Sequence, residues 1–109
     1  MPGGFLHTLA HPQPPKRPPV KAIVIDDFGG PERLHLADRP TPPIADDQVL
    51  VAVRVAGVNP IDWRIRNGQL KQFVPYEFPV ILGREVSGVV AAVGAAVTGF
   101  QPGDAVFGF

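Results

Sequence analysis

The 109-residue sequence contains no cysteine, and this absence limits its chemistry more than any other feature. It excludes disulfides, cysteine-ligated zinc and a cysteine nucleophile. The three histidines are scattered, with His7 and His11 near the N-terminus and His35 in an expected strand. They do not form a metal-binding pattern. The lack of cysteine is compatible with the cytoplasmic location that we expect for the protein.

The sequence also lacks a basic surface and a long apolar run. Ten Lys and Arg residues balance ten Asp and Glu residues, so we expect no nucleic-acid partner. No apolar segment approaches the roughly 20 residues that a membrane-spanning helix requires, so we expect no membrane partner.

Glycine and proline, in contrast, are abundant, with 12 and 14 residues respectively. This composition favours short strands and turns over long helices, and the length suits one domain. Residues 1–19 hold six prolines and lack the apolar core of a secretory signal. We therefore expect a disordered or polyproline-like leader over 1–19 and a folded domain over 20–109.

The apolar pattern of the domain predicts several short strands and one short helix. Strands are expected at 21–26, 33–38, 48–55 and about 85–93, with another beginning at 105. The first two should form a hairpin around residues 28–31. In residues 48–55, Val49, Val51, Val53 and Val55 are expected on one face of the strand. These elements fit a small barrel or sandwich.

The expected helix begins at Asn59-Pro60 and ends at Asn67-Gly68. Asparagine is a favoured N-cap, proline suits the first helical position, and glycine suits the residue that follows a helix. Residues 69–79 should form an irregular loop that carries Phe73, Tyr76 and Phe78.

Three stretches, at residues 56–63, 78–90 and 93–108, resemble the medium-chain dehydrogenase/reductase superfamily, specifically its zinc-independent quinone oxidoreductase-like branch. The resemblance covers about residues 20–109. It implies a mainly β fold, a GroES-like partly open β-barrel with one short helix. In whole enzymes of this family a Rossmann domain follows, and the active site lies in the cleft between the two domains.

The Gly-rich fingerprint of that second domain, G-x-G-x-x-G, does not occur in this sequence. We therefore expect residues 20–109 to be an incomplete GroES-like domain that is truncated before the Rossmann domain. The NAD or NADP cofactor that the resemblance implies would require the missing domain.

The resemblance also bears on zinc. Zinc-dependent relatives have a Cys ligand at the position of Asn59 and a His ligand at the position of Arg84. An amide is a poor zinc ligand, and a guanidinium cation repels the metal. Because two of about three required protein ligands are replaced, we expect no catalytic zinc.

Each candidate site residue has a structural and a functional interpretation. Asn59 either caps the helix or also presents its amide to the nicotinamide or the substrate oxygen as a catalytic group. Asp62 either stabilises the first helical turn or forms an ion pair with Arg84 in the cleft. Arg84 and Glu85 would be a solvated pair in isolation, whereas the resemblance places them near the cleft.

The aromatic residues Trp63, Phe73 and Tyr76 either line a pocket for a planar substrate or pack to anchor the loop. Relatives often have a tyrosine shortly after the helix, where this chain has Leu70. This difference weakens the transfer of a tyrosine hydrogen-bond donor from the family.

The function that the resemblance implies is hydride transfer from NAD(P)H to a small-molecule quinone or enone. We expect the isolated chain to be inactive and to self-associate through the exposed cleft surface. The alternative is a non-enzymatic binding or assembly module with the same GroES-like barrel, because a fold does not determine a function.

Overall fold

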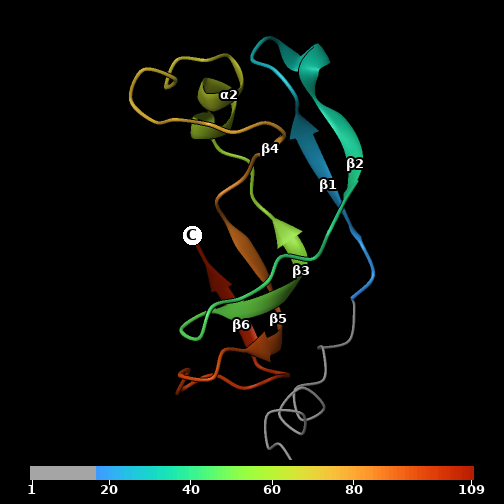
Figure 1. The fold of residues 1–109 in the computed structure, drawn as a ribbon, viewed down its shortest axis with the longest axis vertical. Coiled ribbons are helices and arrows are strands. Elements are labelled where there is room, and N and C mark those ends of the chain that lie inside the picture. Colours follow the sequence, from blue (N-terminus) through green and yellow to red (C-terminus); the bar gives the residue numbers. More distant parts are fainter. Residues whose placement is uncertain (1–16) are drawn as a thin grey trace, which may run out of the picture.

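The computed structural model describes residues 17–109, so most of the expected leader over 1–19 lies outside the described residues. The described chain forms two three-stranded antiparallel sheets, one 3₁₀ turn and one α-helix (Figure 1). This architecture confirms the mainly β fold with one short helix that the sequence predicts. No helix within residues 17–109 is long and apolar enough to cross a bilayer.

The first sheet has the strand order β2-β1-β4, with β1 over Val20–Ile25, β2 over His35–Arg39 and β4 over Val80–Ile81. Strands β1 and β2 form the expected hairpin, in which Ala22 lies opposite Ala37. The second strand begins two residues later than predicted. The reason is that Pro31–Arg33 forms the 3₁₀ turn η1, which removes Arg33 from the strand.

The second sheet has the order β3-β5-β6, with β3 over Val49–Ala56, β5 over Val86–Val93 and β6 over Ala105–Gly108. The register between β3 and β5 shifts between Leu50 and Val51, and again between Val53 and Val55. The first shift has its extra residue in β5, at Ala91, and the second has it in β3, at Arg54, which reverses the face of Val55 relative to the three valines before it. The prediction that the four valines of β3 share one face is therefore wrong.

Helix α2 spans Pro60–Arg66, and Gly68 follows it with a φ of +87°. Both ends agree with the prediction from Asn59-Pro60 and Asn67-Gly68. Backbone contacts fasten its last turn to the β1–β2 connection, because Gly29 donates its N–H to the Arg66 carbonyl oxygen at 2.9 Å. The Arg66 Nε donates in return to the Gly29 carbonyl oxygen at 3.2 Å.

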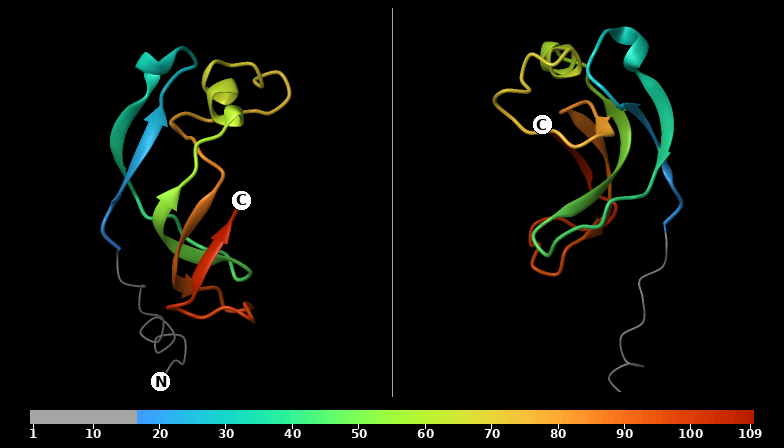
Figure 2. Two further views of the ribbon diagram at one scale, coloured as in Figure 1. Left: turned by 180° about the vertical axis from the view of Figure 1, so that it is seen from behind. Right: turned by 45° about the horizontal axis from the view of Figure 1, so that its top comes forward.

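The helix and the 69–79 loop lie together at one end of the two sheets, as both views in Figure 2 show. Among residues 17–109, the buried apolar residues are few: Val24, Ile25, Ile65 and Val90. Large apolar side chains such as Val55 and Phe107 remain exposed. The sheets therefore form an open structure, with helix α2 and the 69–79 loop at one end and the turn before β6 at the other.

Candidate functional site

The Asp62 carboxylate joins the start of helix α2 to the segment before β5. It is only 6% exposed, yet both of its oxygens accept backbone hydrogen bonds. Oδ2 accepts from the Asn59 N–H at 3.0 Å, and Oδ1 accepts from the Gly83 N–H at 3.1 Å. One buried side chain thus holds the residues at positions 59 and 83 together.

A second hydrogen bond joins the same two segments. The Gly57 N–H donates to the Glu85 carbonyl oxygen at 2.9 Å. Gly57 also leaves room for the Glu85 side chain, since a Cβ at Gly57 would lie 2.5 Å from Glu85 Oε2. The segments 57–59 and 83–85 therefore run side by side. These are the two segments that contain Asn59 and Arg84.

Asn59 is the N-cap of α2, as its residue type predicts. Its side chain and the Asp62 N–H form the remaining half of a capping box, in a geometry too loose for a hydrogen bond. The Asp62 N–H instead donates to the Asn59 carbonyl oxygen at 2.9 Å. The Asn59 side-chain amide is thus only weakly engaged by the helix.

The Asp62–Arg84 ion pair that the sequence left open does not form. Within the described part of the chain, the ion pairs are Lys21–Asp38 and His35–Asp26, both in the first sheet. Arg84 and Glu85 are exposed. Asp62 needs no cation because two backbone N–H groups and the positive end of the helix dipole stabilise its charge.

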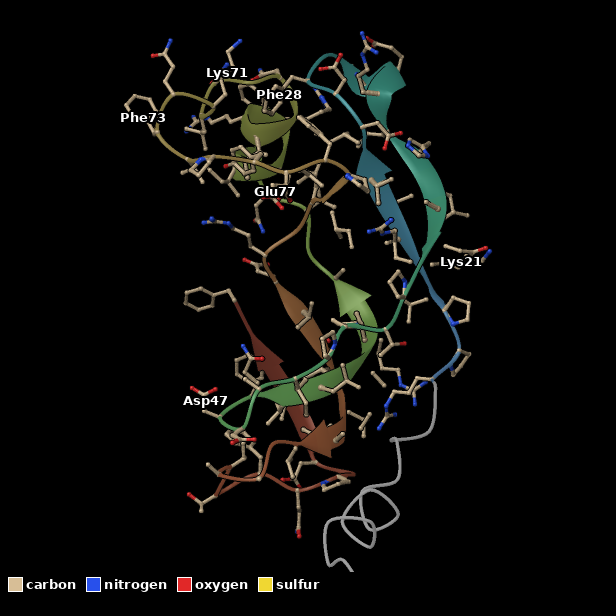
Figure 3. The ribbon with its side chains drawn as sticks, viewed as in Figure 1. Lys21, Phe28, Asp47, Lys71, Phe73 and Glu77 are labelled. Atoms are coloured by element: carbon tan, nitrogen blue, oxygen red, sulfur yellow. The ribbon has the colours of Figure 1, made fainter. Side chains whose placement is uncertain are left out.

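The aromatic residues divide between packing and surface. The rings of Tyr76 and Phe78 pack edge-on against Phe28, with centroids 6.1 and 5.0 Å away. This cluster anchors the 69–79 loop beside α2, whereas Phe73 lies at the outer side of the loop and is 78% exposed (Figure 3). Trp63 is 43% exposed, and the Arg64 guanidinium lies 5.6 Å from its ring centroid.

One surface cleft, of about 800 Å³, does not contain the predicted site residues. It is lined by Arg17, Pro19, residues 38–44, Leu50 and Ala92. The smaller groove, about 250 Å³, includes Glu85 in its wall. It also includes Gly57, Phe107 and Phe109, which sequence reasoning did not select as site residues. Gly57 and Phe107 could have been selected from the sequence, because both lie in the stretches that resemble the family.

The donor set does not fit a catalytic zinc ion. An amide and a guanidinium occupy positions 59 and 84, and the Asp62 carboxylate is fully engaged by backbone N–H groups. Across residues 17–109, no three His, Cys, Asp or Glu side chains gather as a metal site would require.

Comparison with known proteins agrees with this geometry. The family described as the alcohol dehydrogenase GroES-like domain matches residues 45–108. Quinone oxidoreductase from Sus scrofa is 43% identical over 91 residues, which cover 81% of this chain and 26% of that protein. The chain thus spans about a quarter of the length of the relatives that it matches.

Solved structures show the same similarity. The Escherichia coli quinone oxidoreductase complexed with NADPH superimposes with a TM-score of 0.73 at 32% identity, covering 81% of this chain and 26% of that one. The human synaptic vesicle membrane protein VAT-1 homolog-like protein gives 0.78 at 33% identity, covering 84% and 28%. These findings confirm the predicted resemblance, and the chain belongs to the alcohol dehydrogenase GroES-like domain family, within the quinone oxidoreductase group of medium-chain dehydrogenases/reductases.

Proposed function

We propose that this chain is the substrate-side domain of an NAD(P)H-dependent oxidoreductase that reduces quinones or enones. The observation that supports this most directly is the double hydrogen bond of Asp62, which brings the 57–59 and 83–85 segments side by side. In the family, these segments border the cleft in which substrate and nicotinamide meet. The proposal therefore places the substrate beside Asn59.

The chemistry requires a donor at the substrate oxygen. A reduced nicotinamide supplies a hydride, and negative charge then develops on that oxygen. A preorganised hydrogen-bond donor stabilises this charge. The Asn59 amide is the group that we assign to this task, because the helix engages it only weakly.

The other predicted residues take supporting roles in this proposal. Asp62 positions Asn59 through its backbone and does not contact the substrate. Arg84 and Glu85 present exposed charges at the edge of the cleft. Trp63 offers an exposed ring for a planar substrate, and Tyr76 holds the loop in place through its contact with Phe28.

We further propose that this reaction uses no zinc, because the side chains at positions 59 and 84 are a poor ligand and a cation. The chain contains no dinucleotide fingerprint, so the nucleotide has to be held by another domain. NADPH is the first cofactor to test, since the Escherichia coli relative is complexed with it. We propose a cytoplasmic location for the protein.

A chimera tests the function directly. Residues 20–109 would replace the matched quarter of the Sus scrofa quinone oxidoreductase, and NADPH oxidation by a quinone would be measured. We expect the chimera to reduce the quinone. The variant Asn59→Asp should lower kcat/KM by about 10²- to 10³-fold, because it removes the amide donor.

The variant Asn59→Asp should keep the cap of helix α2, because aspartate and asparagine are about equally favoured at the N-cap. Its melting temperature should therefore stay close to that of the parent chimera. If Asn59→Asp left kcat/KM unchanged in a folded chimera, the assignment of Asn59 would be wrong. A folded chimera that binds NADPH but reduces neither quinone nor enone would contradict the proposed function.

A further inference from the structure

The loop over residues 69–79 has no hydrogen bond to a strand within the described part of the chain. Its backbone hydrogen bonds are local. The Gln69 N–H donates to the Arg64 carbonyl oxygen at 3.1 Å, and the Phe73 N–H donates to that of Leu70 at 3.0 Å. Contacts of another kind therefore fix where the loop lies relative to the sheets.

Both ends of the loop meet one short segment, which consists of the end of β1 and the turn that follows it. At the start of the loop, Arg66 and Gly29 exchange two hydrogen bonds, of 2.9 and 3.2 Å. At its end, Val80 in β4 lies opposite Ile25 in β1. Residues 25–29 thus hold the entry and the exit of the loop, an arrangement typical of compact surface loops.

Phe28 lies at the centre of this base, beside helix α2 (Figure 3). Its ring packs edge-on against Tyr76 and Phe78, with centroids 6.1 and 5.0 Å away. On the helix side, a Cβ added to Gly68 would lie 3.4 Å from the Cβ of Phe28. One half-buried side chain therefore contacts both the beginning of the loop and its second half.

The tip of the loop lies away from this base. Lys71 and Phe73 are on the outer side of the loop in Figure 3, and the Phe73 side chain is 78% exposed. The structure thus provides two phenylalanines for comparison. Phe28 packs against the base of the loop, and Phe73 is carried at its tip.

The loop also connects the elements that flank the candidate site. Helix α2, which Asn59 caps, leads into the loop, and β4, which precedes the 83–85 segment, follows it. Asn59 itself is held at the other end of α2, through the Asp62 carboxylate. The position of the loop and the position of Asn59 therefore depend on different contacts.

We propose that Phe28 is a positioning residue that holds the 69–79 loop against the first sheet and thereby fixes one side of the substrate site. The role in substrate binding rests on the proposed function, whereas the anchoring of the loop does not. Phe28 contacts neither substrate nor nicotinamide in this proposal. Its loss should weaken substrate binding and leave hydride transfer at Asn59 largely intact.

Trypsin cleavage after Lys71 measures the anchoring without any enzymatic activity. In the 109-residue chain, Phe28→Ala should speed this cleavage at least about tenfold, because the loop leaves its base more often. Cleavage after Arg54 in β3 requires the second sheet to open and should change much less. The control Phe73→Ala removes the same ring from the tip and should leave both rates close to those of the wild type.

The chimera described above measures the effect on the site. Phe28→Ala should raise the KM for the quinone about tenfold, because a loop that is in place a tenth of the time lowers the apparent affinity by that factor. The kcat should stay close to that of the parent chimera. Phe28→Leu restores much of the apolar volume and should return KM toward the parent value.

Four results would decide against parts of this picture. Equal cleavage after Lys71 in wild type and Phe28→Ala would overturn the anchoring. Equal acceleration after Lys71 and Arg54 would also overturn it, because Phe28 would then stabilise the whole domain. A loosened loop with an unchanged KM would overturn the link to the site. A chimera that binds NADPH but reduces neither quinone nor enone would contradict the proposed function and that link, while the trypsin result would still decide the anchoring.

Discussion

At the scale of single residues, Asp62 makes more of the hydrogen bonds that hold the candidate site together than any residue that was expected to touch the substrate. A buried carboxylate is costly unless its charge is compensated. Here two backbone N–H groups, from Asn59 and Gly83, supply that compensation. The same bonds hold two segments that are 21 residues apart in sequence. Asp62 is therefore a positioning residue with a large structural effect.

Replacing this carboxylate should destabilise the domain. In Asp62→Ala, two part-buried backbone N–H groups lose their acceptor, which should cost about 2 kcal/mol of unfolding free energy. For a domain of this size, that corresponds to a fall in melting temperature of roughly 10 °C. Asp47→Ala removes an exposed carboxylate and should stay within about 0.5 kcal/mol. Equal urea-unfolding midpoints for the two variants would contradict the role of Asp62.

At the scale of elements, β5 organises the second sheet because it is the only strand that pairs with both β3 and β6. Gly88 lies at its centre, opposite Val53 on one side and Val106 on the other. A Cβ at this position would collide with the carbonyl oxygen of Ala52. The close approach of β3 to β5 thus depends on a residue without a side chain.

This contact predicts a strong difference between two glycines of the same sheet. Gly88→Ala should lower the unfolding free energy by more than about 2 kcal/mol, because the obstructing atom is rigid backbone. Gly108→Ala in β6 should change it by less than about 0.5 kcal/mol, since nothing lies within 4 Å of its added Cβ. Urea unfolding of both variants measures the difference. Similar losses would show that β3 can move away from β5.

At the scale of the whole molecule, residues 17–109 form an open structure with a small core. The buried apolar side chains among them are Val24, Ile25, Ile65 and Val90, while apolar residues of the second sheet such as Phe107 face solvent. The relatives that the chain matches are about three times as long, since the 81% of this chain that aligns makes up 26% of the Sus scrofa protein. Trp63, Arg84 and Glu85 are exposed, and the sequence contains no Gly-rich dinucleotide fingerprint.

The isolated chain should consequently show no turnover. With NADPH and a quinone, the absorbance of NADPH should decrease no faster than in the absence of protein. The chimera described above serves as the positive control under the same conditions. Steady oxidation of NADPH by the isolated chain would show that a nucleotide site exists within these 109 residues.

Local patterns predicted much of this molecule because they depend on neighbours in sequence. The cap at Asn59, the end of α2 at Gly68 and the β1–β2 hairpin all follow from backbone preferences within a few residues. The amide at position 59 and the guanidinium at position 84 are likewise given by the sequence. The face of Val55 in β3 was predicted wrongly, because the extra residue Arg54 is recognised only from the pairing of β3 with β5.

The sequence by itself determined which residue types are available at the site, including an amide at position 59 and a guanidinium at position 84. Only the tertiary structure decided their partners. The bond from Gly83 to Asp62, the packing of Tyr76 on Phe28 and the pairing of β6 with β5 each join segments that are separated along the chain. No periodicity within one segment contains that information, because such contacts form only when separate elements pack together.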